Sequence, residues 1–244
     1  MSELIEGRNA VLEALRSNQE FQRVLIARGV KPNATLDEIR LLAKTASVRV
    51  VEVDRAELDR LSPRGAHQGV AAEAAPFRFA ELADVLRRTV DATASLIVVL
   101  DHVTDPGNLG AIIRSVEVAG GDAVIVAKDR SAPVTAVVHK ASAGATAHLP
   151  VVRVVNICQT LRALKDAGFW VLGASEKAEL LAWETPFDGR IALVMGAEGA
   201  GLSRVVQEAC DLLVRLPVHG HISSLNVAQA TTVLAFEWVR RSRR

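Results

Sequence analysis

Apolar positions in the first 75 residues alternate between the spacing typical of helices and the continuity typical of buried strands. Helical spacing is found in three segments, residues 8–18, 35–47 and 55–61. Strand-like runs occupy residues 21–29, 48–53 and 67–74. In the second helical segment Thr35 is a candidate N-cap, and Glu38 three positions later would complete a capping box. The pattern predicts a small α/β domain over residues 1–75.

Residues 76–95 interrupt this alternation. The segment begins with Pro76 and ends in a run of small and polar residues, and only its middle has helical character. We therefore expect a linker with one short helix, which divides the chain into two domains.

From residue 96 the alternation resumes with more strongly apolar strands. The predicted strands lie within residues 96–100, 122–127, 149–154, 169–175, 191–197 and 211–218. The helical segment at 156–168 has Asn156 in the N-cap position and Gly168 just past its end. Strands that are apolar on both faces and alternate with helices indicate a parallel sheet covered on both sides. Residues 96–244 are predicted to form this second α/β domain, with ligands beyond the carboxyl ends of its strands.

Three strand-to-helix junctions of the second domain are dense in glycine and polar residues. They are residues 101–121, residues 194–203 and the stretch that starts at residue 216. A parallel sheet would bring all three to one edge. One such junction could be no more than a turn, since Gly and Asn tolerate positive φ, but three together indicate a site. Among their polar side chains, those that could form a site are Asn108, Arg114, Glu198, Ser223, Ser224 and Asn226.

This set of side chains suits the binding of a phosphate and the orientation of a polar nucleophile. A guanidinium such as that of Arg114 can form two parallel hydrogen bonds to phosphate oxygens. Helix N-termini offer backbone N–H donors to the same anion.

Several common sites do not match these junctions. Residues 196–201 lack the glycine order of a dinucleotide-binding turn, and the chain has neither a P-loop nor a nucleophile elbow. A hydrolase with Ser224 as nucleophile would need His219 or His221 as its base. These two histidines also have no third metal ligand at a suitable spacing. We expect no metal site and regard a hydrolase as the weakest alternative.

Composition narrows the class of protein further. Half of the 244 residues are apolar and 23% are charged, as in a globular protein with a sizeable core. The apolar runs are far shorter than the ~20 residues of a membrane helix, and the first residues lack the pattern of a signal peptide. Cys158 and Cys210 show no metal-type spacing, and we expect both to be small core residues in a reducing cytoplasm.

The formal net charge of +1 is divided evenly along the chain, so overall attraction would not hold a nucleic acid. A basic footprint would have to be local. The tail at residues 240–244 is one such patch, or only a basic helix end favoured by the helix dipole. With three Trp, six Phe and no Tyr, stacking of bases on side chains should contribute little.

Taken together and in order, the three junctions resemble the signature motifs of the SpoU family of RNA ribose 2'-O-methyltransferases, within the SPOUT superfamily. Residues 108–120 resemble the first motif, 193–203 the second and 216–230 the third. Residues 1–75, with His-Gln-Gly at 67–69, resemble the L30e-like RNA-binding domain found in some members. The likeness covers most of the chain.

The resemblance implies a parallel-sheet SPOUT domain with a trefoil knot near the carboxyl end of the chain. It also implies S-adenosylmethionine as the cofactor and a homodimer with the active site at the subunit interface. The cofactor contacts implied by the motifs are Gly196, Gly201, Leu216 and Leu225.

Catalytic roles follow from the same resemblance. Arg114 is implied to activate the ribose 2'-hydroxyl, with Asn108, Ser224 and Asn226 holding it and the neighbouring phosphate. Glu198 is implied to orient Arg114 or a loop. Because a guanidinium stays protonated at ordinary pH, polarisation of the hydroxyl through the RNA phosphate is easier to accept than a neutral arginine base.

An L30e-like domain is typical of members that act on 23S ribosomal RNA. The likeness is greatest to bacterial enzymes that methylate a guanosine ribose in the peptidyl-transferase loop, so the expected partner is 23S ribosomal RNA or a large-subunit precursor. The alternatives are another ribosomal site, as in thiostrepton-resistance enzymes, transfer RNA, or a non-catalytic ribosome-associated RNA-binding protein. Two departures from the family pattern, Ala228 and residues 219–222, lie outside the implied catalytic positions.

Overall fold

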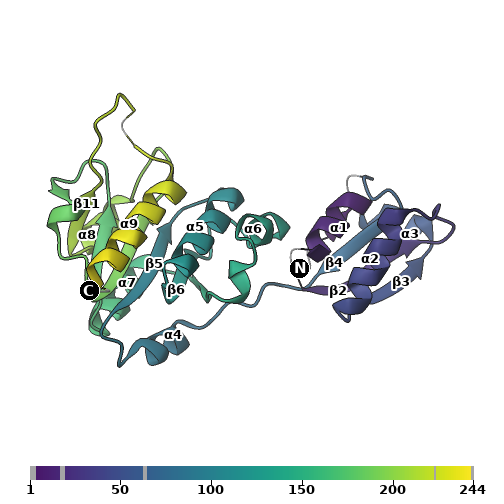
Figure 1. Cartoon of the computed structure of the whole chain (residues 1–244), viewed down its shortest axis with the longest axis horizontal. Coiled ribbons are helices and arrows are strands. Elements are labelled where there is room, and N and C mark those ends of the chain that lie inside the picture. Colours follow the sequence, from purple (N-terminus) through teal and green to yellow (C-terminus); the bar gives the residue numbers. More distant parts are fainter. Residues whose placement is uncertain (1–3, 17–19, 63–64, 223, 243–244) are drawn as a thin grey trace. The chain divides into compact units, whose positions relative to one another are not determined.

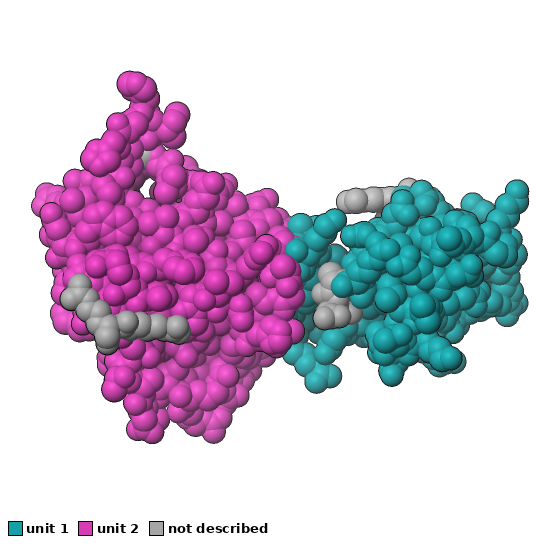
Figure 2. Space-filling view, in the orientation of Figure 1, with its two compact units in different colours: residues 1–78, 134–140 teal, residues 79–133, 141–244 magenta. Residues whose placement is uncertain are grey.

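The computed structural model describes residues 4–16, 20–62, 65–222 and 224–242. The chain forms two compact units (Figure 2). The first comprises residues 1–78 and 134–140, and the second comprises residues 79–133 and 141–244.

The first unit contains a four-stranded sheet in the order β1-β4-β2-β3. Its strands are β1 (Leu4–Glu6), β2 (Phe21–Ala27), β3 (Arg49–Val53) and β4 (Val70–Ala74). Strands β2 and β3 are parallel, and β4 is antiparallel to both of its neighbours. The helices are α1 (Arg8–Arg16), α2 (Ala34–Thr45) and α3 (Arg55–Leu61), and most of α6 (Ala136–Ala141) also belongs to this unit.

Alternation along β2 decides which helices cover which face of this sheet. Val24 and Ile26 lie in one core with the apolar residues of α1 and α2. Leu25 lies in a second core with Leu58 of α3. Because successive strand residues point to opposite faces, α1 and α2 cover one face and α3 the other.

The start of α2 differs from the sequence prediction. The N-cap is Asn33, whose side chain accepts a hydrogen bond from the Leu36 backbone N–H at 3.0 Å. Thr35 already lies in the first turn of the helix, so the predicted Thr35 and Glu38 capping box is wrong. The physical reason is that Asn33 has an extended backbone, which lets its side-chain oxygen reach the free N–H groups.

The second unit contains a seven-stranded sheet in the order β7-β6-β5-β10-β8-β11-β9 (Figure 1). Its strands are β5 (Ser95–Asp101), β6 (Ala123–Ala127), β7 (Val151–Val154), β8 (Trp170–Ala174), β9 (Leu180–Leu181), β10 (Arg190–Gly196) and β11 (Leu212–Arg215). Every neighbouring pair is parallel, which confirms the predicted parallel sheet. The short edge strand β9 was not predicted.

Helices cover both faces of this sheet. Buried residues of α4 (Leu82–Thr89), α7 (Ile157–Asp166) and α8 (Arg204–Ala209) share one core with β5, β6 and β10. Helices α5 (Pro106–Val118) and α9 (Val227–Ser242) pack against each other and lie together in front of the sheet in Figure 1. Asn156 caps α7 as predicted, with its Oδ1 accepting from the Gln159 N–H at 3.0 Å.

The border between the units falls between Arg78 and Phe79, whereas the sequence pattern predicts a border at residue 75 and a linker at 76–95. The short helix expected in that linker is α4. Its apolar side packs on the second core, where Val85 is fully buried. Residues 79–95 are therefore counted with the second unit.

Two further sequence features can be placed on this fold. Cys158 and Cys210 are both free and partly buried, and both pack against the core shared by α7 and α8. Burial raises the pKa of the Cys210 thiol to about 12. Within the described ranges, no helix combines the length and apolar character that a membrane crossing needs.

Candidate active site

The carboxyl ends of β5, β10 and β11 bring the three polar junctions to one edge of the second sheet (Figure 1). Asp101, the last residue of β5, pairs in register with Gly196, the last residue of β10. Strand β8 separates β10 from β11. The parallel sheet therefore gathers loops whose residues lie up to 118 positions apart in sequence.

The first junction presents Asn108 from the first turn of α5. Asp105 is the N-cap of this helix, and its Oδ1 accepts a hydrogen bond from the Asn108 backbone N–H at 2.7 Å. Pro106 fits the first helical position, where no N–H is needed. The cap fixes the helix start, and with it the position of the Asn108 side chain.

The second junction is a tight loop after β10. The Ala197 and Gly201 backbones exchange two hydrogen bonds, at 3.1 and 2.8 Å. A Cβ on Gly196 would lie only 2.2 Å from the Gly201 carbonyl carbon, so no side chain fits there. Gly201 has φ +66, which glycine adopts without strain. The buried Asp101 anchors the far end of the loop, because its Oδ2 accepts from the Ser203 N–H at 2.8 Å.

The third junction runs from β11 to α9 and ends at Asn226. The Asn226 Oδ1 accepts hydrogen bonds from the Ala228 and Gln229 backbone N–H groups, at 2.9 and 3.4 Å. Asn226 thus satisfies donors at the start of α9. Ser223 lies outside the described residues.

Asn108, Glu198 and Asn226, one from each junction, form a hydrogen-bonded cluster. The Asn108 Nδ2 donates to Glu198 Oε1 at 2.8 Å, and the Asn226 Nδ2 donates to the same oxygen at 2.6 Å. The Asn226 Nδ2 also lies 3.0 Å from Asn108 Oδ1, to which it donates. A single carboxylate therefore fixes the orientation of both amides, since an ionised carboxylate only accepts hydrogen bonds.

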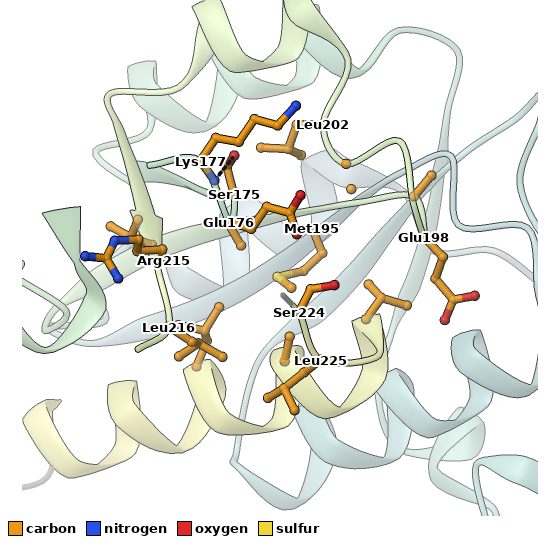
Figure 3. Close-up of a pocket in the computed structure, with 18 of the residues that line it drawn as sticks. Ser175, Glu176, Lys177, Met195, Glu198, Leu202, Arg215, Leu216, Ser224 and Leu225 are labelled. Atoms are coloured by element: carbon orange, nitrogen blue, oxygen red, sulfur yellow. Dashed lines mark hydrogen bonds between the residues drawn. The ribbon is translucent and has the colours of Figure 1, made fainter. Parts of the chain in front are cut away.

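A cavity of about 490 Å³ lies beside this cluster (Figure 3). Its walls come mainly from residues 174–177, 195–202, 214–218 and 224–227. The lining includes all four of the predicted cofactor residues, namely Gly196, Gly201, Leu216 and Leu225. It also includes the predicted catalytic residues Glu198, Ser224 and Asn226.

Asn108 and Arg114 do not line this cavity. Asn108 reaches its edge through Glu198 and Asn226, whereas Arg114 is exposed on α5. In the described part of the chain, the Arg114 side chain makes no hydrogen bond or ion pair. Glu198 accordingly contacts the two amides and not Arg114, so it fixes loops rather than the arginine.

Sequence reasoning missed part of the cavity wall. Ser175, Glu176 and Lys177 follow β8 and line the cavity, where the Lys177 N–H donates to the Ser175 Oγ at 3.3 Å (Figure 3). The available signal was a polar run directly after a buried strand, at the same carboxyl edge as the other junctions. Asp101, the anchor of the glycine loop, ends another such strand and was also missed.

Within the described residues, the histidines of the third junction show no arrangement that would support a hydrolase or a metal site. His219 and His221 are both exposed, and no hydrogen bond joins either to Ser224 within the described residues. The described residues also hold no cluster of three or more potential metal ligands.

A parallel sheet with glycine-bordered loops and an amide and carboxylate cluster at its carboxyl edge defines an α/β enzyme with a small-molecule site. Comparison with known proteins gives the family. The family model of the SpoU rRNA methylase family matches residues 95–236, and a model for RNA 2'-O ribose methyltransferase substrate binding matches residues 4–80. The chain belongs to the SpoU rRNA methylase family.

Individual relatives agree with this assignment. The chain is 39% identical over 242 residues to the 23S rRNA (guanosine-2'-O-)-methyltransferase RlmB of Escherichia coli, covering 99% of each chain. It is 39% identical to an uncharacterized tRNA/rRNA methyltransferase of Mycolicibacterium smegmatis, covering 99% of this chain and 77% of that one. The structure resembles the SpoU methyltransferase AviRb of Streptomyces viridochromogenes in complex with AdoMet. The TM-score is 0.72, at 27% identity over 98% of this chain and 90% of that one.

S-adenosylmethionine is the cofactor of this family, and the cavity suits it in size and chemistry. Its volume is within the range of small-molecule sites, roughly 300–1,000 Å³. Apolar side chains such as Leu216 and Leu225 suit an adenine ring, and the bare backbone at Gly196 and Gly201 permits close approach. Two carboxylates, those of Glu176 and Glu198, also line the cavity.

Proposed function

We propose that this protein methylates the 2'-hydroxyl of a ribose in 23S ribosomal RNA, and that the target nucleotide is a guanosine. The observation that carries the proposal is the cluster of Asn108, Glu198 and Asn226 at the edge of the cofactor cavity. The similarity to the Escherichia coli enzyme over 99% of both chains supports the choice of RNA and nucleotide. A ribosomal RNA substrate would place the protein in the cytoplasm.

In this proposal the chain mainly positions the reacting groups. The bound cofactor would supply an electrophilic methyl group. Its transfer from a cationic sulfonium needs little acid assistance. Ser224 and Asn226 border the cavity where the attacking 2'-hydroxyl would be held in line with that methyl group. Asn108 and Glu198 accept both hydrogens of the Asn226 amide, so the cluster is fixed in one arrangement and does not have to reorganise when the substrate binds.

Arg114 is proposed to bind the RNA phosphate next to the reacting ribose. Its guanidinium remains charged at ordinary pH, so it would polarise the 2'-hydroxyl through the phosphate, and the proton of that hydroxyl would pass to water. Because Arg114 lies outside the cavity of its own chain, we propose that it serves the cavity of a second subunit. The site would then be complete only in a homodimer.

The outer surface of α5 and α9 supports such a dimer. Val118 of α5 is 63% exposed, and Val233 and Phe236 of α9 are 37% and 45% exposed. These two helices pack against each other, so their exposed apolar residues belong to one helix pair. We also propose that the segments 196–202, 216–222 and 224–226 take part in the family's trefoil knot.

We propose that the first unit binds the RNA through two loops, one before β4 and one after β2. The buried His67 accepts a hydrogen bond from the Gly69 N–H and contacts Asp59 Oδ1 at 2.8 Å. This clamp supports Gln68, which has φ +49 and is exposed. The loop that follows β2 adds two exposed cations, Arg28 and Lys31. Such a surface offers amide and cationic donors to an RNA backbone.

The proposal is tested by transfer of radiolabelled methyl from S-adenosylmethionine to ribosomal RNA that lacks the modification. Wild-type protein should label one ribose, which becomes resistant to alkaline cleavage at its 3' side. Arg114→Ala should give no label, while the matched control Arg162→Ala, an exposed arginine on α7, should label normally.

Absence of label on ribosomal RNA, with the cofactor still bound, would contradict the proposed substrate. Transfer RNA would then be the next substrate to test. Absence of label on both would leave the non-catalytic RNA-binding alternative.

A further inference from the structure

The wall of the cavity formed by the β8 loop carries a carboxylate, that of Glu176, with no partner among the described residues. Glu176 lines the cavity, and Figure 3 shows its side chain directed into the space beside Met195. It makes no hydrogen bond or ion pair with any part of the chain that the structure describes, and this includes its neighbour Lys177. This carboxylate is free to accept hydrogen bonds from a ligand.

Only one other acidic residue, Glu198, lines the cavity among the described residues. Its Oε1 already accepts hydrogen bonds from the amides of Asn108 and Asn226. Glu198 therefore belongs to the cluster that faces the RNA. Of the two carboxylates, Glu176 is the one that has both oxygens free for the cofactor.

The other walls of the cavity indicate which part of the cofactor Glu176 would meet. The transferred methyl group must face Asn226 and Glu198, where the ribose of the RNA is proposed to bind. The apolar side chains of Leu216 and Leu225 suit the adenine ring. The β8 wall is then left for the cofactor ribose, which links the adenine to the sulfonium end.

We propose that Glu176 binds the ribose of S-adenosylmethionine by accepting hydrogen bonds from its 2'- and 3'-hydroxyl groups. An ionised carboxylate has two acceptor oxygens, and a vicinal diol presents two donors at matching spacing. Hydrogen bonds to a charged acceptor are stronger than those between neutral groups. The inference rests on the cofactor occupying this cavity, as the proposed function requires.

The test is isothermal titration calorimetry of the full-length protein with two ligands. Both ligands contain adenosine with its ribose, but only S-adenosylhomocysteine carries the amino-acid part. Glu176→Gln should raise the Kd of both ligands by about the same factor, roughly tenfold, because one charge-assisted contact is weakened. Glu179→Gln is the matched control, since Glu179 lies in the same loop, is exposed and does not line the cavity.

Two results would overturn the assignment of Glu176 to the ribose. One is an unchanged Kd for 5'-methylthioadenosine together with weaker S-adenosylhomocysteine, which would assign the carboxylate to the ligand's ammonium group. The other is a Kd for both ligands that matches the Glu179→Gln control. Wild-type protein that binds neither ligand would overturn the cofactor site itself, and the proposed function with it. Equal melting temperatures of the two variants exclude a folding defect.

Discussion

At the scale of single residues, Asn226 has two separate tasks. Its Oδ1 accepts hydrogen bonds from the first turn of α9, and its Nδ2 donates to Glu198 and Asn108. The first task stabilises a helix, and the second orients the proposed catalytic cluster. A serine can perform the first task but is too short for the second, so substitution can separate the two.

Asn226→Ser should keep the cap and lose the cluster. We expect its methyl transfer to fall by ~10–100-fold, as for the loss of a hydrogen bond to a charged group, with the melting temperature nearly unchanged. Asn226→Ala should lose the same activity and in addition about 1 kcal/mol of stability, because the cap is gone. Methyl-transfer rates and thermal unfolding of both variants check this. Equal stability of the two would contradict the capping role.

Glu237 lies outside the site and contributes to the dependence of folding stability on pH. Hydrogen bonds from Arg240 and Arg241 lower the pKa of the Glu237 carboxyl below its ordinary value of 4.5. The ion pairs therefore contribute stability above the unfolded pKa, and this contribution is lost as pH falls through the lower folded pKa.

Glu237→Gln should accordingly be less stable than wild type at neutral pH, because both arginines lose their charged partner. The difference between the two proteins should shrink as the pH is lowered below about 4.5, the range in which the unfolded carboxyl is protonated. Thermal unfolding at a series of pH values measures this. A difference that stays constant down to acid pH would show that the ion pairs do not contribute.

At the scale of elements, the loop between β10 and α8 is held by its own backbone and by β5. The paired Ala197 and Gly201 leave no room for a side chain at Gly196, and Asp101 fixes the far end through Ser203. Gly199, within the same loop, has open space around it but a positive φ of 76°. The two glycines are therefore required for different reasons, one steric and one conformational.

Gly196→Ala should prevent the loop from closing and abolish cofactor binding. Gly199→Ala should retain binding, because its Cβ meets nothing and the left-handed backbone costs only about 1–2 kcal/mol. Calorimetric titration with S-adenosylhomocysteine compares the two variants. Equal loss of binding in both would mean that backbone freedom, and not the close approach at Gly196, controls the loop.

At the scale of the whole molecule, the proposed dimer explains why Arg114 lies outside the cavity of its own chain. Phe236→Glu would place an unpaired charge among the apolar residues of α5 and α9. We expect a dimer dissociation constant raised by ~100-fold or more, because burying an unpaired carboxylate is costly. Methyl transfer should fall with dimer content, while S-adenosylhomocysteine should still bind to each monomer.

Light scattering coupled to gel filtration measures the mass, and Val205→Glu on α8 is the matched control. Val205 is also exposed and apolar but lies on the opposite side of the sheet from α9. A Phe236→Glu protein that stays dimeric would contradict the proposed interface. A monomer with full activity would contradict the shared active site.

The amino-acid sequence by itself determined the local elements, because they depend on neighbouring residues. Apolar runs marked the strands, Asn156 marked the start of α7, and the order of three motifs marked the family. Asn33 and Thr35 lie close together and either could cap α2. The backbone conformation makes Asn33 the N-cap, so the prediction of Thr35 was wrong.

Only the tertiary structure decided which polar groups meet. The order of strands in the sheet places Asn108 beside Glu198 and Asn226, although 90 and 118 residues separate them, and no local pattern contains that order. It likewise brings Glu176 to the cavity and leaves Arg114 outside it. The physical reason is that a strand pattern specifies burial, whereas the pairing of strands depends on the packing of the whole sheet and its helices.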